Sequence, residues 1–302
     1  MSPRFTLRQL EFFVAVADAG SVSGAAEACG ASQAGVSLAI RDLERHLGVQ
    51  LLVRRRAKGA ALTEAGSKVL ADARRLLEGA DALQSLASAT DSRVSGIISI
   101  GCYVTLAPFL IPPLLDDFAS RYPSLEVRVS EGSSEEVRDA LLDGRCELAF
   151  LYSNDRGTGL DAITVQTARP YLILSADNPL AAKRQIALAE VADEPLIMFD
   201  VPSARNAARM LADAGLRSNI RHLSQNIEVV RGLVARGIGY SIMVQHWPSD
   251  VSFEGRPIVS RPIADDIPER TAVLAWPERS RLTRRAGAIV DFFRRRQLDD
   301  QQ

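Results

Sequence analysis

The sequence predicts an α/β protein in three parts: a small helical module at the amino terminus, one long helix, and a larger domain of alternating strands and helices. Three observations predict this order. Two short helices separated by a glycine are expected within residues 21–52, an apolar heptad repeat continues to about residue 89, and beyond residue 96 short apolar runs alternate with helical segments. The 302 residues suffice for two or three domains with real cores.

A helix-turn-helix is expected near the amino terminus. Residues 6–19 form an amphipathic helix that would pack behind it. Ser23 is the expected cap of a helix of small residues, and Gly30 breaks that helix. Ser32 then caps the next helix, because its side-chain oxygen can accept hydrogen bonds from the free N–H groups of the first turn. The small residues let the two helices pack closely, as in motifs that enter the major groove of DNA.

The second helix of this motif has an apolar face and a polar row. The apolar stripe comprises Val36, Ile40, Leu43 and Leu47. Roughly a quarter turn away lie Gln33, Ser37 and Arg41, whose side chains suit base edges and phosphates. Helix pairs with a glycine turn also occur as purely structural elements. The motif by itself therefore leaves both interpretations open.

Positive charge gathers around the motif. Residues 31–60 carry six basic and two acidic side chains, a local charge of +4 in a chain whose formal net charge is −1. The basic run Arg54, Arg55, Arg56 and Lys58 follows the second helix, where the wing of a winged helix-turn-helix would present it to phosphates beside the groove. A solvated loop is the alternative for this run taken alone. Together, the charge and the polar row predict binding to double-stranded DNA.

The first 66 residues resemble the LysR-type transcriptional regulators. The resemblance rests on motifs in order: Leu10-Glu11-Phe12-Phe13, Ser21-Val22-Ser23 with Ala25-Ala26, Ser32-Gln33 with Val36-Ser37 and Ile40, Leu43-Glu44, Leu47-Gly48-Val49, Leu51-Leu52 with Arg54-Arg55, and Leu62-Thr63-Glu64-Ala65-Gly66. The family usually has proline where Ala34 stands and phenylalanine where Leu52 stands, and neither departure removes a polar reader. The resemblance implies a DNA-binding regulator. The expected DNA contacts are Ser23, Ser32, Gln33, Ser37, Arg41, Arg54, Arg55, Arg56 and Lys58.

A long helix capped by Thr63 is expected to follow. Two rows recur at intervals of seven residues: Leu62, Val69, Leu76 and Leu83, and between them Gly66, Ala73, Ala80 and Ala87. This pattern is typical of a coiled-coil seam, so we expect a homodimer through this linker helix. Such a pair would match inverted-repeat half-sites in an operator. A helix lying on the core of its own domain is the alternative, and a homotetramer stays open.

Beyond Gly96 the pattern is that of βαβ units and a parallel sheet. Strands are expected at residues 97–100, 125–129, 148–151, 171–174, 196–199, 240–243 and 271–275, and helices at 106–121, 135–143, 206–214, 227–236 and 281–296. The resemblance implies a two-lobe fold like that of periplasmic binding proteins, with lobe I at about 95–165 and 268–297 and lobe II at about 166–267. The expected domains are 1–62 for DNA binding, 63–90 for the linker and 91–302 for effector binding.

The cleft between two such lobes is the expected effector site. The turns at residues 101–105 and 132–136 carry hydroxyls at helix starts, which attract anions. Plain capping, with Ser133 and Glu136 forming a capping box, is the alternative. The resemblance aligns both turns with effector-contacting loops, and Arg205 could pair with a carboxylate, so a small organic carboxylate is expected. The expected contacts are Cys102, Tyr103, Thr105, Ser133, Ser134, Pro202, Ser203, Arg205 and Asn226.

No catalytic or membrane function is expected. The histidines and the three cysteines show no catalytic or ligand spacing, which predicts neither an enzyme nor a cofactor. No apolar run reaches the ~18 residues of a membrane helix and no signal peptide is visible, so we expect a cytoplasmic protein. RNA polymerase would be a further partner of an activator. The alternatives are a cytoplasmic two-lobe solute-binding protein and a redox sensor, for which Cys102 is the candidate thiol.

Overall fold

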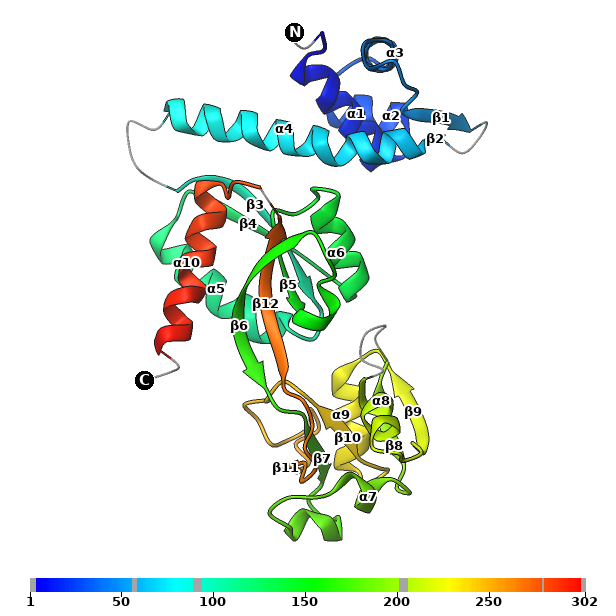
Figure 1. Ribbon diagram of the computed structural model, residues 1–302, viewed down its shortest axis with the longest axis vertical. Coiled ribbons are helices and arrows are strands. Elements are labelled where there is room, and N and C mark those ends of the chain that lie inside the picture. The colour runs from blue at the N-terminus through cyan, green and yellow to red at the C-terminus, as the bar shows by residue number, and fades with distance from the viewer. Residues whose placement is uncertain (1–3, 56–58, 89–93, 201–205, 279, 300–302) are drawn as a thin grey trace.

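The computed structural model describes residues 4–55, 59–88, 94–200, 206–278 and 280–299. Figure 1 shows an amino-terminal module resting on the long helix α4, then lobe I, then lobe II at the far end of the molecule. This order confirms the predicted fold class, which is a winged helix-turn-helix, a linker helix and a two-lobe α/β domain. Within the described part of the chain, the structure has no helix of the length and apolarity that a membrane crossing requires.

The amino-terminal module consists of three helices and a two-stranded wing. The helices are α1 (Leu7–Ala19), α2 (Val22–Ala28) and α3 (Gln33–Leu47), and the wing strands are β1 (Leu52–Arg55) and β2 (Gly59–Leu62). The strands pair in antiparallel fashion, as the predicted wing requires. Ser32 caps α3 by accepting a hydrogen bond from the Gly35 N–H at 3.1 Å, as predicted.

One expected cap is wrong. Ser21, not Ser23, caps α2, because its hydroxyl accepts from the Gly24 N–H at 3.1 Å. Ser23 lies one residue inside the helix, with its side chain exposed. The two serines flank a single valine, and only the position of the first helical N–H groups decides between them.

The linker helix α4 (Glu64–Ser88) serves partly as a core helix of its own module. Gly66 lies so close to the wing that a Cβ there would meet the Leu51 carbonyl oxygen at 2.1 Å, and Ala73 is buried against the module core. Leu76 and Leu83 remain 51% and 68% exposed. The first two residues of the small row therefore pack within the chain, while the later leucines of the large row stay available to a partner helix. Leu62 belongs to β2 and not to the helix.

Lobe I is built on a five-stranded sheet of order β4-β3-β5-β12-β6. The strands are β3 (Gly96–Tyr103), β4 (Leu125–Gly132), β5 (Leu148–Tyr152), β6 (Leu160–Ala168) and β12 (Arg270–Pro277). Three helices flank them: α5 (Ala107–Arg121), α6 (Ser134–Leu142) and α10 (Arg284–Asp299), and a 3-10 turn η1 (Ser153–Asp155) follows β5. The sheet is mixed and not parallel as expected, because β12 pairs antiparallel with both β5 and β6.

Lobe II has a three-stranded antiparallel sheet of order β10-β7-β11 and a parallel pair of strands beside it. The strands are β7 (Tyr171–Ser175), β8 (Leu196–Phe199), β9 (Ile220–Ser224), β10 (Ser241–Met243) and β11 (Ile258–Pro262). The helices are η2 (Pro179–Ala182), α7 (Leu188–Val191), α8 (Asn206–Asp213) and α9 (Ile227–Ala235).

The chain crosses twice between the lobes, as the family resemblance implies. The first crossing leads from β6 to β7 and the second from β11 to β12. β6 belongs to the lobe I sheet up to Ala168, so this lobe extends past the expected boundary at residue 165. Lobe I surrounds one large apolar core, whereas lobe II has two smaller clusters.

Candidate DNA-reading surface and effector cavity

Helix α3 presents the polar row to solvent. Val36 and Leu43 are fully buried on its inner face, and Ile40 is nearly so. Gln33 and Arg41 are exposed on the outer face, and Ser37 between them is partly exposed. Gln33 opens the helix, so the row begins at the end that enters the groove in helix-turn-helix proteins.

The first two residues of the basic run lie on the wing. The backbone of Arg54 and Arg55 continues β1, where it pairs with Ala60 and Gly59 of β2. Arg56 and Lys58 lie outside the described residues. The wing is tied to α3 by Glu44, whose carboxylate accepts hydrogen bonds from the backbone N–H groups at the start of β1 at 2.8 and 3.1 Å. Sequence reasoning did not assign Glu44 this role.

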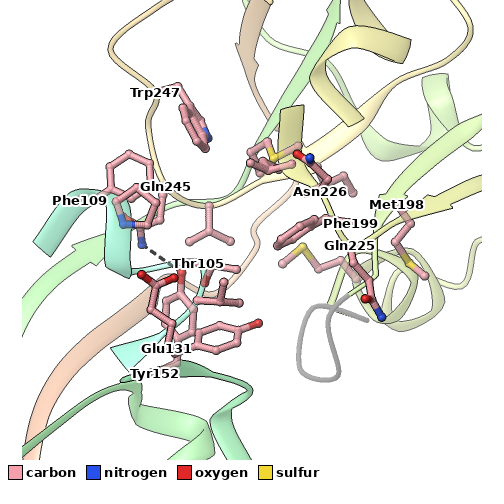
Figure 2. A pocket seen from close by; sticks show the side chains of 18 residues that line it. Thr105, Phe109, Glu131, Tyr152, Met198, Phe199, Gln225, Asn226, Gln245 and Trp247 are labelled. Atoms are coloured by element: carbon pink, nitrogen blue, oxygen red, sulfur yellow. Dashed lines mark hydrogen bonds between the residues drawn. The ribbon is translucent and has the colours of Figure 1, made fainter. Parts of the chain in front are cut away.

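A cavity of about 360 Å³ lies between the two lobes. Figure 2 shows side chains from both lobes converging on it. Lobe I contributes residues from the ends of β3, β4 and β5 and from the start of α5, and these are Tyr103, Val104, Thr105, Pro108, Phe109, Glu131 and Tyr152. Lobe II contributes Met198, Phe199, Met210, Gln225, Asn226, Ile227, Ile242, Met243, Val244, Gln245 and Trp247.

Gln245 joins the lobes at the cavity. Its Nε2 donates to the Tyr152 hydroxyl of lobe I at 3.0 Å, and its Oε1 accepts from the Gln166 amide on β6. The Gln245 backbone carbonyl accepts from the Tyr171 hydroxyl at 2.9 Å. Burial raises the pKa of Tyr152, so this phenol stays neutral and keeps its proton. A buried hydrogen-bond network of this kind holds the two lobes in place relative to each other beside the cavity.

An aromatic contact closes one side of the cavity. The rings of Phe109 on α5 and Trp247 of lobe II meet edge to face, with centroids 5.3 Å apart. Behind Trp247, the Arg231 guanidinium lies 4.8 Å from the ring centroid. Arg231 is only 3% exposed, and it donates to the carbonyls of Ser249 and Val251 at 2.8 and 2.7 Å. This cation supports the wall and is not part of the lining.

The lining has few polar groups. Figure 2 shows Glu131, Thr105 and Tyr152 together on the lobe I wall, and Gln225 and Asn226 on the lobe II wall. The Thr105 hydroxyl is buried and forms no hydrogen bond of normal geometry, although it lies near enough to the Tyr152 hydroxyl to offset part of the rise that burial causes in the pKa of Tyr152. Asn226 caps α9 by accepting from the Glu228 N–H at 2.9 Å. Among the described lining residues there is one carboxylate and no lysine or arginine.

The structure brings three of the expected effector contacts to the cavity, namely Tyr103, Thr105 and Asn226. Pro202, Ser203 and Arg205 lie outside the described residues. Sequence reasoning missed Glu131, Gln245, Trp247 and Phe109. Glu131 directly precedes the expected turn at residues 132–136, and this adjacency was the available signal for it.

Three other expected contacts lie outside the lining. Ser133 forms the capping box with Glu136 that was the alternative interpretation, and this box lowers the pKa of Glu136. Ser134 donates to Asp155 at 3.0 Å. Cys102 is fully buried in the lobe I core, and desolvation raises the pKa of its thiol. Capping and packing account for these side chains without a ligand.

A winged helix-turn-helix joined through a long helix to two lobes with a cavity between them defines a ligand-responsive DNA-binding regulator. Residues 7–67 match the family description "Bacterial regulatory helix-turn-helix protein, lysR family", and residues 91–298 match "LysR substrate binding domain". The chain belongs to the LysR family of transcriptional regulators, whose members are regulators and not enzymes. The family resemblance expected from the sequence is thus confirmed.

Individual relatives agree with this assignment. A probable hydrogen peroxide-inducible genes activator of Mycobacterium avium is 30% identical to this chain over 80% of its length and 78% of the relative. The crystal structure of HinK, a LysR family regulator from Pseudomonas aeruginosa, shares 32% identity with a TM-score of 0.62 and covers 96% of this chain and 98% of that one. Full-length CbnR complexed with its target DNA shares 25% identity with a TM-score of 0.55, covering 96% and 99%. LysR regulators bind DNA and small-molecule effectors and act as oligomers.

Proposed function

We propose that this protein binds inverted-repeat operator DNA as a dimer in the cytoplasm and that a small molecule held between the lobes changes its grip on the operator. The observation that carries the proposal is the division of α3 into a buried apolar face and an exposed row beginning at Gln33, beside a paired wing. RNA polymerase is a further partner if the protein activates transcription.

The row on α3 is proposed to read bases, and the wing to contact phosphates. Replacement of Gln33 or Ser37 by alanine then lowers discrimination between operator and mutated operator by about 1–3 kcal/mol. Arg55→Ala weakens binding to all sequences about equally and reduces the salt dependence. Lys68→Ala, which removes an exposed charge from α4 paired with Glu64, is the control. Mobility shifts with the operator and the mutated operator measure these effects. If the Gln33 and Ser37 variants discriminate between the two duplexes as well as the wild type does, bases are contacted by residues other than this row of α3.

The exposed part of α4 is proposed to form the dimer contact. Leu76 and Leu83 stand one heptad apart and are more than half exposed in the described chain. Replacing both by glutamate places charges on this seam and is expected to give a monomer in analytical ultracentrifugation, with weakened operator binding. Val229→Glu, which changes an exposed apolar residue on α9, is expected to keep the dimer. A double variant that stays dimeric would contradict the proposed seam.

A redox signal is the alternative suggested by the names of the peroxide-responsive relatives. A thiol that senses peroxide reacts as an accessible thiolate of lowered pKa. Cys102 and Cys146 are buried, and the pKa of Cys102 is raised. These properties favour an effector in the cavity over a switch at Cys102 or Cys146. The organic carboxylate expected from the sequence would need Arg205 as its cationic partner, because the described lining residues include no lysine or arginine.

A further inference from the structure

The described lining of the cavity limits the chemistry of its ligand. We propose that the effector is an apolar, ring-bearing molecule with an O–H or N–H donor and no acid group, held with its donor toward Glu131. This inference rests on the proposed function, since it assumes that the cavity between the lobes is the effector site. It replaces the carboxylate expected from the sequence.

The size and the walls of the cavity fit a molecule of about two fused rings. An engineered protein cavity of about 150 Å³ holds benzene, and this cavity measures about 360 Å³. Aromatic rings stand on both sides, with Phe109 from lobe I and Phe199 and Trp247 from lobe II. The thioethers of Met198 and Met243 add polarizable surface that packs well against rings.

Within the described lining of the cavity, no cation is present to pair with an acid. Glu131 is the one carboxylate among the described lining residues; it is exposed, so solvent screens part of the repulsion that a bound carboxylate beside it would meet. Arg231 is turned away, held by two carbonyls and covered by the Trp247 ring. Arg270 acts on the Tyr152 phenol through space but does not belong to the lining.

The polar groups of the lobe I wall favour a ligand that carries a hydrogen-bond donor. The carboxylate oxygens of Glu131 are hydrogen-bond acceptors, so a ligand group that binds beside them supplies the hydrogen. The Thr105 hydroxyl on the same wall has no hydrogen bond of normal geometry, and it can accept from a ligand or donate to one. Asn226 stands across the cavity on the lobe II wall, where it caps α9. A hydroxyl or amino group near Glu131 and a ring system between the lobes satisfy this arrangement.

Three probes of equal ring size separate the possibilities: 1-naphthol, which has a donor; 1-methoxynaphthalene, which has none; and 1-naphthoate, which is an acid. Isothermal calorimetry with the full-length protein is expected to rank them in that order. The donor is expected to strengthen binding by about tenfold, the usual effect of one hydrogen bond in a protein site. Tighter binding of 1-naphthoate than of 1-naphthol, or no binding of any probe, would overturn the proposed ligand class.

Variants of the cavity assign the effect to its residues. Glu131→Gln is expected to reduce the preference for 1-naphthol over 1-methoxynaphthalene and to strengthen binding of 1-naphthoate. Glu126→Gln makes the same change on the same strand, at an exposed position paired with Arg128, and is expected to leave the ranking unchanged. Ile227→Trp fills the cavity and is expected to abolish binding of all three probes while operator binding persists.

The outcomes distinguish this inference from the proposed function. If 1-naphthoate binds and the binding is lost in both Ile227→Trp and Arg205→Ala, the cavity is the effector site but the ligand is an acid, and only the inference fails. If Ile227→Trp leaves binding of the probes unchanged, the site itself is misassigned and the proposed function fails in its effector part. Operator binding is measured separately and decides the DNA-binding part.

Discussion

Arg74 is predicted to couple the DNA-binding module to lobe I. It lies on α4, is 8% exposed, and forms an ion pair with Asp18 near the end of α1. Its Nη1 also donates to the Asp143 carbonyl at 3.0 Å, just past the end of α6. Helix α6 begins directly after the strand that carries Glu131 into the cavity. One side chain therefore connects α1, the linker helix and a helix that starts beside the effector site.

The contribution of Arg74 follows from its contacts. A hydrogen bond from a charged donor contributes about 1.5–3 kcal/mol, and the bond from Arg74 to the Asp143 carbonyl is partly buried. The pair with Asp18 adds less than about 1 kcal/mol, because the Asp18 side chain is 56% exposed and solvent screens it. Arg74→Met keeps an unbranched apolar stem and removes both contacts, so we expect a loss of about 2–3 kcal/mol in local stability where α6 meets α4.

Hydrogen exchange of the full-length protein measures this loss. Amides at the end of α6 and in the middle of α4 are expected to exchange roughly 30- to 150-fold faster in Arg74→Met, since each 1.4 kcal/mol is a factor of ten. Arg75→Met is the matched control, because the Arg75 pair with Asp72 is exposed and contributes little. Equal exchange in the two variants, within threefold, would refute the coupling role.

Three further predictions test other parts of the structure. Hydrogen peroxide is expected to change operator affinity less than twofold, equally in the wild type and in Cys102→Ser, because the thiol is buried with a raised pKa; a response lost in the variant would show a redox switch. The pKa of Glu136 is lowered by its capping hydrogen bonds, so their stabilisation is present above its ordinary value of 4.5 and lost as the pH falls through the lowered value; acid titrations of unfolding should lose this component in Glu136→Gln, and an unchanged pH profile would contradict it. Gly239→Ala places a Cβ 2.0 Å from the Pro195 carbonyl oxygen and is expected to destabilise lobe II by at least about 2 kcal/mol in urea denaturation, whereas Gly232→Ala, in open space on α9, should not destabilise it; equal midpoints would contradict the clash.

Local patterns predicted the amino-terminal module well because its determinants are close in sequence. Caps, a glycine turn and a helical stripe lie within a few residues of one another, and Val36 and Leu43 are buried as their spacing requires. The cap expected at Ser23 lies two residues away, at Ser21. The heptad rows predicted a seam, but they could not show that Gly66 and Ala73 pack inside the chain, since that depends on where α1 and the wing lie.

The lobes were harder to predict where strands are only half buried. β6 and β9 carry polar residues between their apolar ones and β9 is mostly exposed, so neither resembles a strand of a buried parallel sheet. β12 is antiparallel to β5 because the chain returns to lobe I at the second crossing, and no local sequence pattern predicts that return. The same holds for the cavity: Glu131 comes from lobe I and Gln245 and Trp247 from lobe II, and they line one cavity only because the two lobes face each other.

Selection of bound sequences from a random duplex pool tests the central claim most directly. The claim is that two copies of α3 read operator DNA as a symmetric pair. The full-length protein is expected to enrich inverted repeats whose half-sites are separated by about one helical turn, roughly 10 base pairs, or a multiple of it, and the enrichment should be lost in the Leu76→Glu, Leu83→Glu double variant. Enrichment of a single unrepeated motif, or of no motif, would contradict the claim.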